Sequence, residues 1–221
     1  MARGGCGILS CKKQYTGWFN VYGVIQPLFI DIDEHWAEVT TNRMNGLGII
    51  EGYPGEGLVR TARLDRNITR AEFISLLFRL LNINPDNLIL ETYDYDETHA
   101  ILEEYFENFA EIPKWVVEVL AASTKAGLVD ASEGVFLANE PITRLEAAVM
   151  VSKAFKILEQ YQPIDLTQFK DAKDIPDWAQ ASLAEDVIEG YPDSTFRPDN
   201  FITRAEALTV LMRLFIIGMG L

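Results

Sequence analysis

One five-residue motif occurs three times in this chain, and this repetition constrains the fold more than any other feature. Each occurrence follows a segment of the form Phe-x-acid that leads to a tryptophan, namely Trp36, Trp115 or Trp178. Ordered internal repeats are typical of proteins built from tandem structural units. We therefore divide the chain into three repeat copies, residues 29–83, 109–160 and 161–221, with a leader at residues 1–28 and a connector at residues 84–108. The motif is Ile68-Thr69-Arg70-Ala71-Glu72 in the first copy, Ile142-Thr143-Arg144-Leu145-Glu146 in the second and Ile202-Thr203-Arg204-Ala205-Glu206 in the third.

Each copy is predicted to fold as a helix, a loop and a second helix. The second helix begins at the Thr-Arg-x-Glu string, and Ile74, Leu77, Phe78 and Leu81 then follow the i, i+3, i+4, i+7 pattern of a buried stripe. Gly and Pro punctuate the loops, and strand signals are weak throughout. The sequence therefore predicts an all-α fold. The acidic, aromatic connector is expected to be amphipathic, with Ile101, Leu102, Tyr105, Phe106 and Phe109 suited to one side of an extra helix.

Composition excludes several classes of function. The 221 residues carry a formal net charge of −14, so the chain lacks the basic surface that nucleic-acid binding requires. Two cysteines and two histidines are too few for a disulfide scaffold or an imidazole-rich metal centre. The leader is basic (+3) and is interpreted as unstructured or as the remnant of an upstream domain. Its Cys6 and Cys11 fit either a local disulfide or two unrelated thiols. No apolar run has the length of a membrane helix, and no signal peptide is evident.

The threonine and the glutamate of each motif form a predicted capping box. The threonine hydroxyl accepts the backbone N–H three residues later, and the glutamate reaches back to the threonine N–H. This structural role accounts for both residues in all three copies. The predicted pairs are Thr69 with Glu72, Thr143 with Glu146, and Thr203 with Glu206.

The motif arginines need a different explanation. Arg70, Arg144 and Arg204 occupy the first helical position, where the helix dipole disfavours a cation by about 0.3–1 kcal/mol. One explanation is an internal partner, such as Asp31, Glu111 or Asp171 from a neighbouring copy. The other is an external anion, held jointly by the guanidinium and by free N–H groups of the helix. The residues alone leave both explanations open.

Aromatic residues leave a similar choice. Trp36, Trp115 and Trp178 are interpreted as core anchors, with sugar-stacking platforms in a groove as the alternative. Tyr53 and Tyr191 follow Gly52 and Gly190 on loops, where they are placed either to touch a ligand or to pack within the turn.

These motifs together resemble the S-layer homology (SLH) repeat. The resemblance covers nearly everything from Phe29 to Ile217, and the third copy, with Asp193-Ser-Thr-Phe196-Arg197-Pro198 before its motif, is an especially close match. It implies a pseudo-threefold assembly of helix-loop-helix repeats around a central three-helix bundle. It also implies a monomeric triplet at the cell surface. Grooves between the repeats would bind pyruvylated secondary cell-wall polysaccharide attached to peptidoglycan.

The resemblance also implies a set of ligand-binding residues. The motif arginines would meet the ketal carboxylate, while the early aspartates would contact sugar or orient the groove. Two departures in the second copy, Asp130-Ala131 in place of Gly-Tyr and Glu111 in place of aspartate, indicate that the three grooves are not equal. The implied set is Arg70, Arg144, Arg204, Asp31, Asp171, Tyr53, Tyr191, Gly52 and Gly190.

Two other classes of function compete with an anchor. A helical-repeat scaffold could use its acidic faces to bind a basic protein partner without carbohydrate. Catalysis has little support, because adjacent acids such as Asp31 and Asp33 fit a solvated face, and His35 and His99 lack a paired Ser or Cys signature. The sequence implies no metal and no cofactor.

Overall fold

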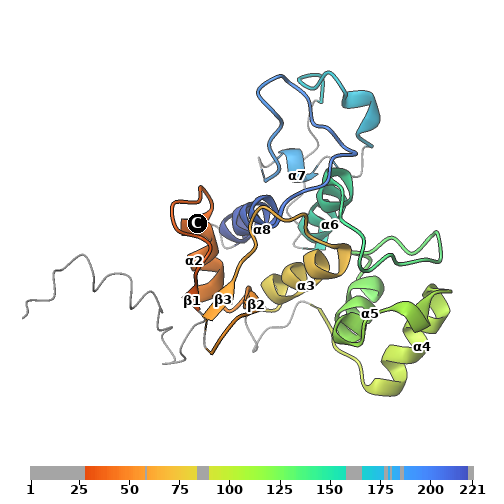
Figure 1. Ribbon diagram of the computed structural model, residues 1–221. Coiled ribbons are helices and arrows are strands. Elements are labelled where there is room, and N and C mark those ends of the chain that lie inside the picture. The colour runs from red at the N-terminus through yellow and green to blue at the C-terminus, as the bar shows by residue number, and fades with distance from the viewer. Residues whose placement is uncertain are drawn as a thin grey trace, which may run out of the picture. The chain divides into compact units, whose positions relative to one another are not determined.

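The computed structural model describes residues 28–57, 59–83, 90–157, 166–176, 179, 181–184 and 187–218 (Figure 1). The expectations for the leader, for Cys6 and Cys11 and for Trp178 concern residues outside this described part. The chain forms two compact units, an N-terminal unit of Met1–Leu64 and a C-terminal unit of Asp65–Leu221.

The described part of the N-terminal unit combines one helix with a small sheet. Helix α2 spans Glu38–Gly46, and the strands are β1 (Leu28–Phe29), β2 (Tyr53–Pro54) and β3 (Val59–Thr61). The strand order is β1-β3-β2, with β1 parallel and β2 antiparallel to β3. The sequence did not predict this sheet, because strands of two or three residues are too short to show an alternating pattern.

The described part of the C-terminal unit is helical, which confirms the all-α class. Each second helix begins at its motif arginine, as predicted: α3 at Arg70, α6 at Arg144 and α8 at Arg204. The connector carries the extra helix α4, which begins earlier than expected. Its N-cap residue Asp94 forms a capping box with Glu97 in the first turn of the helix. The helices are α3 (Arg70–Leu81), α4 (Tyr95–Tyr105), α5 (Val117–Lys125), α6 (Arg144–Ile157), α7 (Ala181–Ala184) and α8 (Arg204–Gly218), with short 3-10 turns η1 (Phe109–Glu111), η2 (Lys114–Val116) and η3 (Ala172–Asp174).

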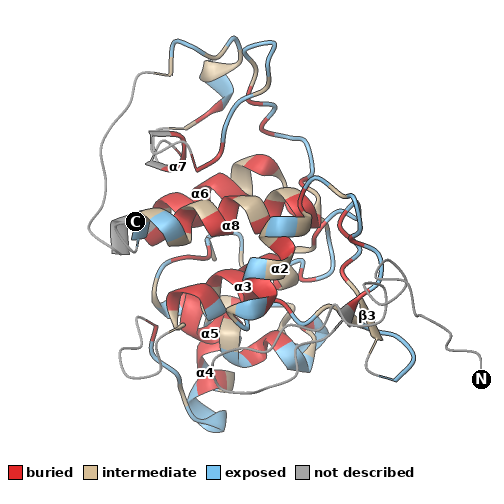
Figure 2. Ribbon diagram, turned by 90° about the vertical axis from the view of Figure 1, so that its left-hand side faces the viewer, coloured by how far each residue is buried: buried red, intermediate tan, exposed pale blue. Residues whose placement is uncertain are grey.

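The core of this unit lies between the helices, on the red stripes of Figure 2. Helix α3 packs on α5 and α8, α4 packs on α5, and α6 packs on α7 and α8. Large side chains such as Phe73 and Leu77 of α3 are fully buried, whereas α6 buries the small Ala147 and Ala148. Small residues allow close helix approach. No helix in the described ranges is both long enough and apolar enough to cross a bilayer.

A closed ring of backbone hydrogen bonds joins the three motifs. Ile68 N–H donates to Ile202 O (3.1 Å), Ile202 N–H to Ile142 O (3.2 Å), and Ile142 N–H to Ile68 O (3.0 Å). All three isoleucines are buried. The three copies are therefore interlocked at the residue that precedes each capping box. The full pseudo-threefold assembly around a central three-helix bundle stays a prediction.

Candidate functional site

Capping boxes fix the backbone that presents each motif arginine. Thr69 Oγ1 accepts the Glu72 N–H (3.2 Å), and a Glu72 carboxylate oxygen accepts the Thr69 N–H (3.0 Å). The same reciprocal bonds join Thr143 to Glu146 and Thr203 to Glu206. Each arginine is thus held at the first position of its helix.

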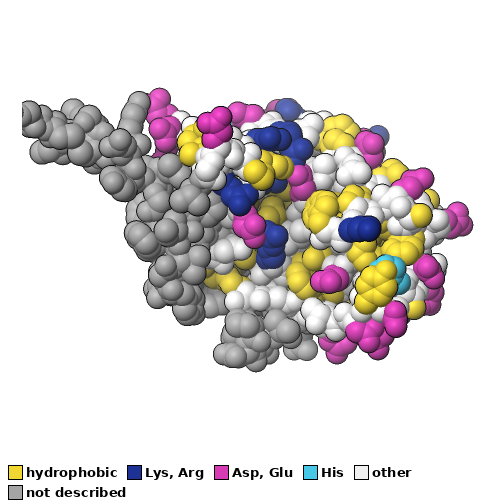
Figure 3. Space-filling model, turned by 60° about the horizontal axis from the view of Figure 1, so that its bottom comes forward, with side chains coloured by type: hydrophobic (Ala, Val, Ile, Leu, Met, Phe, Trp, Pro, Cys, Tyr) yellow, Lys and Arg dark blue, Asp and Glu magenta, His cyan; other side chains and the backbone are white. Residues whose placement is uncertain are grey.

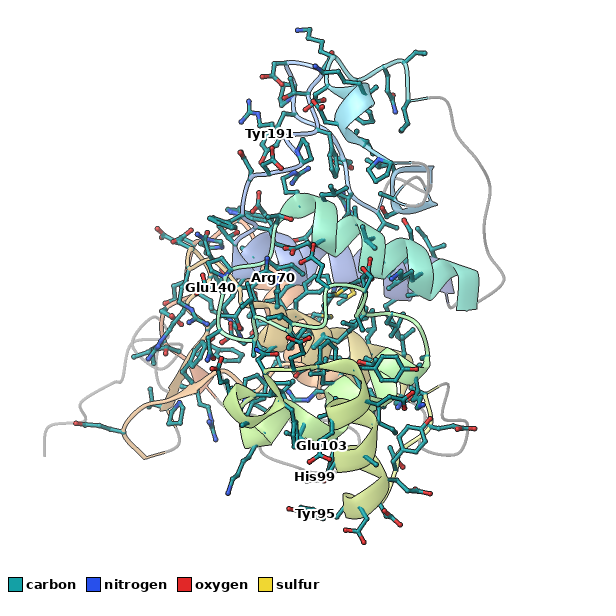
Figure 4. The ribbon with its side chains drawn as sticks, turned by 90° about the vertical axis from the view of Figure 1, so that its right-hand side faces the viewer. Arg70, Tyr95, His99, Glu103, Glu140 and Tyr191 are labelled. Atoms are coloured by element: carbon teal, nitrogen blue, oxygen red, sulfur yellow. The ribbon has the colours of Figure 1, made fainter. Side chains whose placement is uncertain are left out.

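A second ring of hydrogen bonds uses the N–H groups of the arginines themselves. Arg70 N–H donates to Glu140 O (3.0 Å), Arg144 N–H to Asn200 O (2.8 Å) and Arg204 N–H to Arg66 O (2.9 Å). Arg70 and Glu140 are labelled in Figure 4. The next N–H in α3 and in α6 is bonded as well, to Ala138 O and Pro198 O. The hypothesis that free helix N–H groups help to hold an anion is therefore wrong for these two helices. At the start of α3 and α6, the guanidinium groups of Arg70 and Arg144 are therefore the groups left to bind an anion.

Two of the three guanidinium groups lie against capping-box glutamates. Arg70 donates from Nε (2.9 Å) and Nη2 (2.6 Å) to Glu146 Oε1. Arg204, with only 5% of its surface exposed, has Nη1 at 3.9 Å from Glu72 Oε2. Glu72 also accepts from Arg66. The internal partners are therefore the glutamates of neighbouring motifs, not Asp31, Glu111 or Asp171 as predicted.

Arg144 has a different environment. Its side chain is buried, with 6% of the residue exposed. Nε donates to Phe196 O (2.9 Å) and Nη2 to Glu189 O (2.8 Å), and both acceptors are neutral carbonyls. Among the described residues, no carboxylate forms an ion pair with it. The guanidinium lies over the ring of Tyr191 at 4.7 Å and that of Phe196 at 5.1 Å.

Two guanidinium groups lie near the ring of Tyr191. The guanidinium carbon of Arg197 is 3.9 Å from the ring centroid, and that of Arg144 is 4.7 Å from it. Asp193 holds Arg197 in place at 2.9 Å and accepts from the Thr195 hydroxyl at 2.6 Å. These bonds, that from Thr195 first, lower the pKa of Asp193 to about 2. The loop before α8 therefore holds Arg197 over Tyr191, which is labelled in Figure 4.

The N-terminal unit builds its tyrosine loop in the same way. Arg63 lies over Tyr53 at 4.2 Å. Both Arg63 (φ 52°) and Arg197 (φ 58°) adopt the left-handed backbone conformation, which lets each side chain fold back over the tyrosine. The sequence did not single out either arginine, because neither lies in the repeated five-residue motif.

The early aspartates hold these loops through backbone hydrogen bonds. Asp31 accepts the N–H groups of Ala62 (2.7 Å) and Arg63 (2.8 Å). Asp171 accepts those of Phe196 (2.8 Å) and Arg197 (2.7 Å). Burial alone would raise the pKa of Asp171, but these two N–H groups outweigh it and hold the pKa below its ordinary value.

The second copy uses Asn108 at this position, not Glu111. Asn108 Oδ1 accepts the Phe136 N–H (3.0 Å), and Asn108 Nδ2 donates to Phe136 O (3.1 Å). Phe106-x-Asn108 is thus the counterpart of Phe169-x-Asp171. The spacing of a phenylalanine and a polar residue two positions later also fits Phe106 and Asn108. The pattern Phe-x-acid, which requires an acid at the third position, instead matched Phe109-Ala-Glu111.

Gly52 and Gly190 have a packing role in the structure. A Cβ atom at Gly52 would lie 2.3 Å from Phe29 Cε1, and one at Gly190 would lie 2.3 Å from Phe169 Cε1. Such distances are far below van der Waals contact. The glycine of one motif is therefore required by the phenylalanine of another.

The prediction that the tryptophans are core anchors is wrong for Trp36 and Trp115. They are 63% and 58% exposed, respectively. The next residues, Ala37 and Val116, are fully buried instead, as is Ala179 after Trp178. The turn therefore points Ala37 and Val116 inward and leaves the rings of Trp36 and Trp115 at the surface.

A cavity of about 290 Å³ opens beside Arg70. Its walls include Asp130, Ser132, Phe136 and Glu146, from α6 and from the loop between α5 and α6. The described residues include no group of three or more His, Cys, Asp or Glu side chains suited to a metal ion.

Comparison with known proteins finds a family match for part of the chain. Residues 109–148 and 168–208 match the family model of the S-layer homology domain. The cellulosome-anchoring protein of Acetivibrio thermocellus is 30% identical over 178 residues, which cover 74% of this chain and 34% of that protein. The amylopullulanase of Thermoanaerobacterium thermosulfurigenes is 29% identical over 191 residues, or 83% of this chain and 9% of the enzyme. The S-layer protein sap of Bacillus anthracis is 24% identical over 212 residues, or 90% of this chain and 24% of that protein.

The chain spans no more than about a third of the length of the first curated relatives that it matches. The two matched segments contain the capping boxes of Thr143 with Glu146 and of Thr203 with Glu206, the buried Ile142 and Ile202, and the tyrosine loop of the third copy. This chain therefore carries S-layer homology domains at residues 109–148 and 168–208.

Proposed function

We propose that this chain anchors a protein non-covalently to the bacterial cell envelope by binding pyruvylated secondary cell-wall polysaccharide. The names of its relatives, among them a cellulosome-anchoring protein and an S-layer protein, support anchoring at the cell surface. The surroundings of Arg144 support an anionic sugar as the ligand.

The buried guanidinium of Arg144 is the observation that carries this proposal. A buried charge is costly unless an opposite charge compensates it. The described protein groups supply only two carbonyl acceptors, which leaves the positive charge without a carboxylate. A ketal carboxylate from the ligand would provide the missing counter-charge in a site of low dielectric, where a charge-assisted hydrogen bond is strong.

The neighbouring side chains suit the rest of the sugar. Tyr191 offers an aromatic ring for stacking, and Arg197 adds a second positive charge. Asp171 would act through the loop that it holds rather than by touching sugar. The same proposal assigns Arg204 of the C-terminal unit to a ligand carboxylate, and in the N-terminal unit Tyr53 would stack on sugar while Asp31 holds its loop.

Catalysis is not part of the proposal. The amylopullulanase and the exoglucanase XynX are matched over only 9% and 16% of their lengths, so their activities are not carried over to this chain. A scaffold for a basic partner receives less support, because acidic side chains occur at several separate places on the face drawn in Figure 3, mixed with basic and hydrophobic ones.

Co-sedimentation with purified cell-wall sacculi tests the proposal. The intact chain should pellet with pyruvylated sacculi and stay in solution with sacculi whose pyruvate has been removed by mild acid. Replacing Arg144 by glutamine should weaken binding by about 10- to 100-fold, the equivalent of one charge-assisted hydrogen bond of about 1.5–3 kcal/mol. Exposed Arg66→Gln is the matched control, and far-UV circular dichroism checks folding of both variants. Equal binding to sacculi with and without pyruvate would refute the proposal.

A further inference from the structure

The cavity beside Arg70 differs from the surroundings of Arg144 in shape. In the third copy, the Tyr191 ring covers the guanidinium of Arg144 at 4.7 Å. The second copy has Asp130-Ala131 where the other copies have Gly-Tyr, and an alanine side chain ends at Cβ. The described residues place no such ring over Arg70. Arg70 instead lines a cavity of about 290 Å³.

The two sites also differ in charge. Arg70 is already neutralised, because its Nε and Nη2 both donate to Glu146. Asp130 and Glu133 add two further carboxylates to the walls. The backbone N–H and the hydroxyl of Ser132 lower the pKa of Asp130, so this carboxylate is ionised at neutral pH. Lys153 of α6 interacts electrostatically with Asp130 but does not line the cavity. Its single positive charge still leaves the cavity with a net negative charge.

The walls match the chemistry of an uncharged sugar. Carboxylate oxygens of Asp130, Glu133 and Glu146 accept hydrogen bonds from hydroxyl groups. Phe136 and Met150 provide apolar surface for the C–H faces of a pyranose ring. A ligand carboxylate would instead meet like charges, which raise the free energy of binding.

We propose that the Arg70 cavity binds an uncharged sugar residue and excludes the pyruvylated, anionic one, so that the Arg70 and Arg144 sites recognise different parts of one polysaccharide. This inference rests on the proposed function of Arg144. It assigns selectivity to the three carboxylates and to the missing tyrosine of the second copy. Capture of two different sugar residues by one chain would raise affinity without any new contact at Arg144.

Amide NMR titrations of the full chain with two small probes test the inference. The probes are a methyl hexopyranoside that carries a 4,6-pyruvate ketal and its ketal-free parent. We expect the parent to shift amides of residues 128–137 and the ketal probe to shift those of residues 189–197. Glu146→Gln removes the charge that neutralises Arg70 while its amide can still cap the helix, so the ketal probe should then also shift residues 128–137. Ser132→Trp fills the cavity and should weaken parent binding at least about tenfold, leaving the ketal probe unaffected.

The outcomes separate this inference from the proposed function. If the parent shifts no amide of residues 128–137, or if the ketal probe binds there in the unmodified chain as tightly as the parent, the inference is overturned. The proposed function stands in both cases when the ketal probe still shifts residues 189–197. If the ketal probe shifts nothing at residues 189–197 while the parent shifts residues 128–137, the role of Arg144 fails and the selectivity of the cavity is supported.

Discussion

Replacing Gly190 by alanine should destabilise the loop that carries Tyr191. The added Cβ would lie 2.3 Å from Phe169 Cε1, 3.1 Å from Phe169 Cδ1 and 3.2 Å from Thr195 O. Gly190 is not among the residues with positive φ, so steric overlap, rather than backbone strain, accounts for the expected cost.

The size of the destabilisation depends on how far the Phe169 ring can move. Its ring centroid lies 6.2 Å from that of the buried Phe196, and the Phe169 backbone N–H donates to Leu166 O. Overpacking of this kind costs about 1–3 kcal/mol of unfolding free energy. Gly46→Ala is the matched control: no heavy atom lies within 4 Å of its Cβ position, at the end of α2. This change should stabilise the chain by about 0.5–1 kcal/mol, because alanine loses less backbone entropy in a helix.

Urea unfolding followed by circular dichroism measures both effects. The midpoint should fall for Gly190→Ala and rise for Gly46→Ala. Combining Gly190→Ala with Phe169→Leu should give less than the sum of the single effects, because the smaller side chain removes the overlap. Strict additivity, or a Gly190→Ala variant as stable as the unmodified chain, would refute the steric coupling of the two motifs.

Two further predictions concern the polar groups that hold these loops. Asn108→Ala should lower the unfolding free energy by about 1–3 kcal/mol in urea titrations, since two hydrogen bonds to Phe136 are lost. Asn108→Asp should not restore the stability, because a carboxylate cannot donate to Phe136 O. Full restoration would contradict this account. Because the folded pKa of Asp193 is lowered from 3.8 to about 2, its stabilising contribution is complete above pH 3.8 and is lost as the pH falls toward 2. The amide NMR shift of Thr195, whose N–H donates to Asp193 Oδ1 (3.1 Å), should follow this titration, and Asp193→Asn should abolish it; an unchanged titration in that variant would assign it to another group.

Local sequence patterns predicted the helices and their caps because the interactions involved are local. A threonine and a glutamate three residues apart form a capping box whatever surrounds them. The apolar spacing after Arg70 likewise places one face of α3 inward. The short strands of the N-terminal unit were missed because two or three residues cannot show an alternating pattern, and the Asn108 clamp was missed because its partner Phe136 is 28 positions away.

The sequence by itself determined that this chain is a helical repeat protein. In each repeat copy the second helix begins at an arginine that follows a threonine N-cap. It also identified the family through the order of its motifs. The tertiary structure alone decided which arginine keeps an uncompensated charge. Arg70 and Arg144 have the same local sequence context, yet Glu146 neutralises one and carbonyl oxygens surround the other. The physical reason is that a charge is balanced or exposed by its neighbours in space, and those neighbours come from other copies of the repeat.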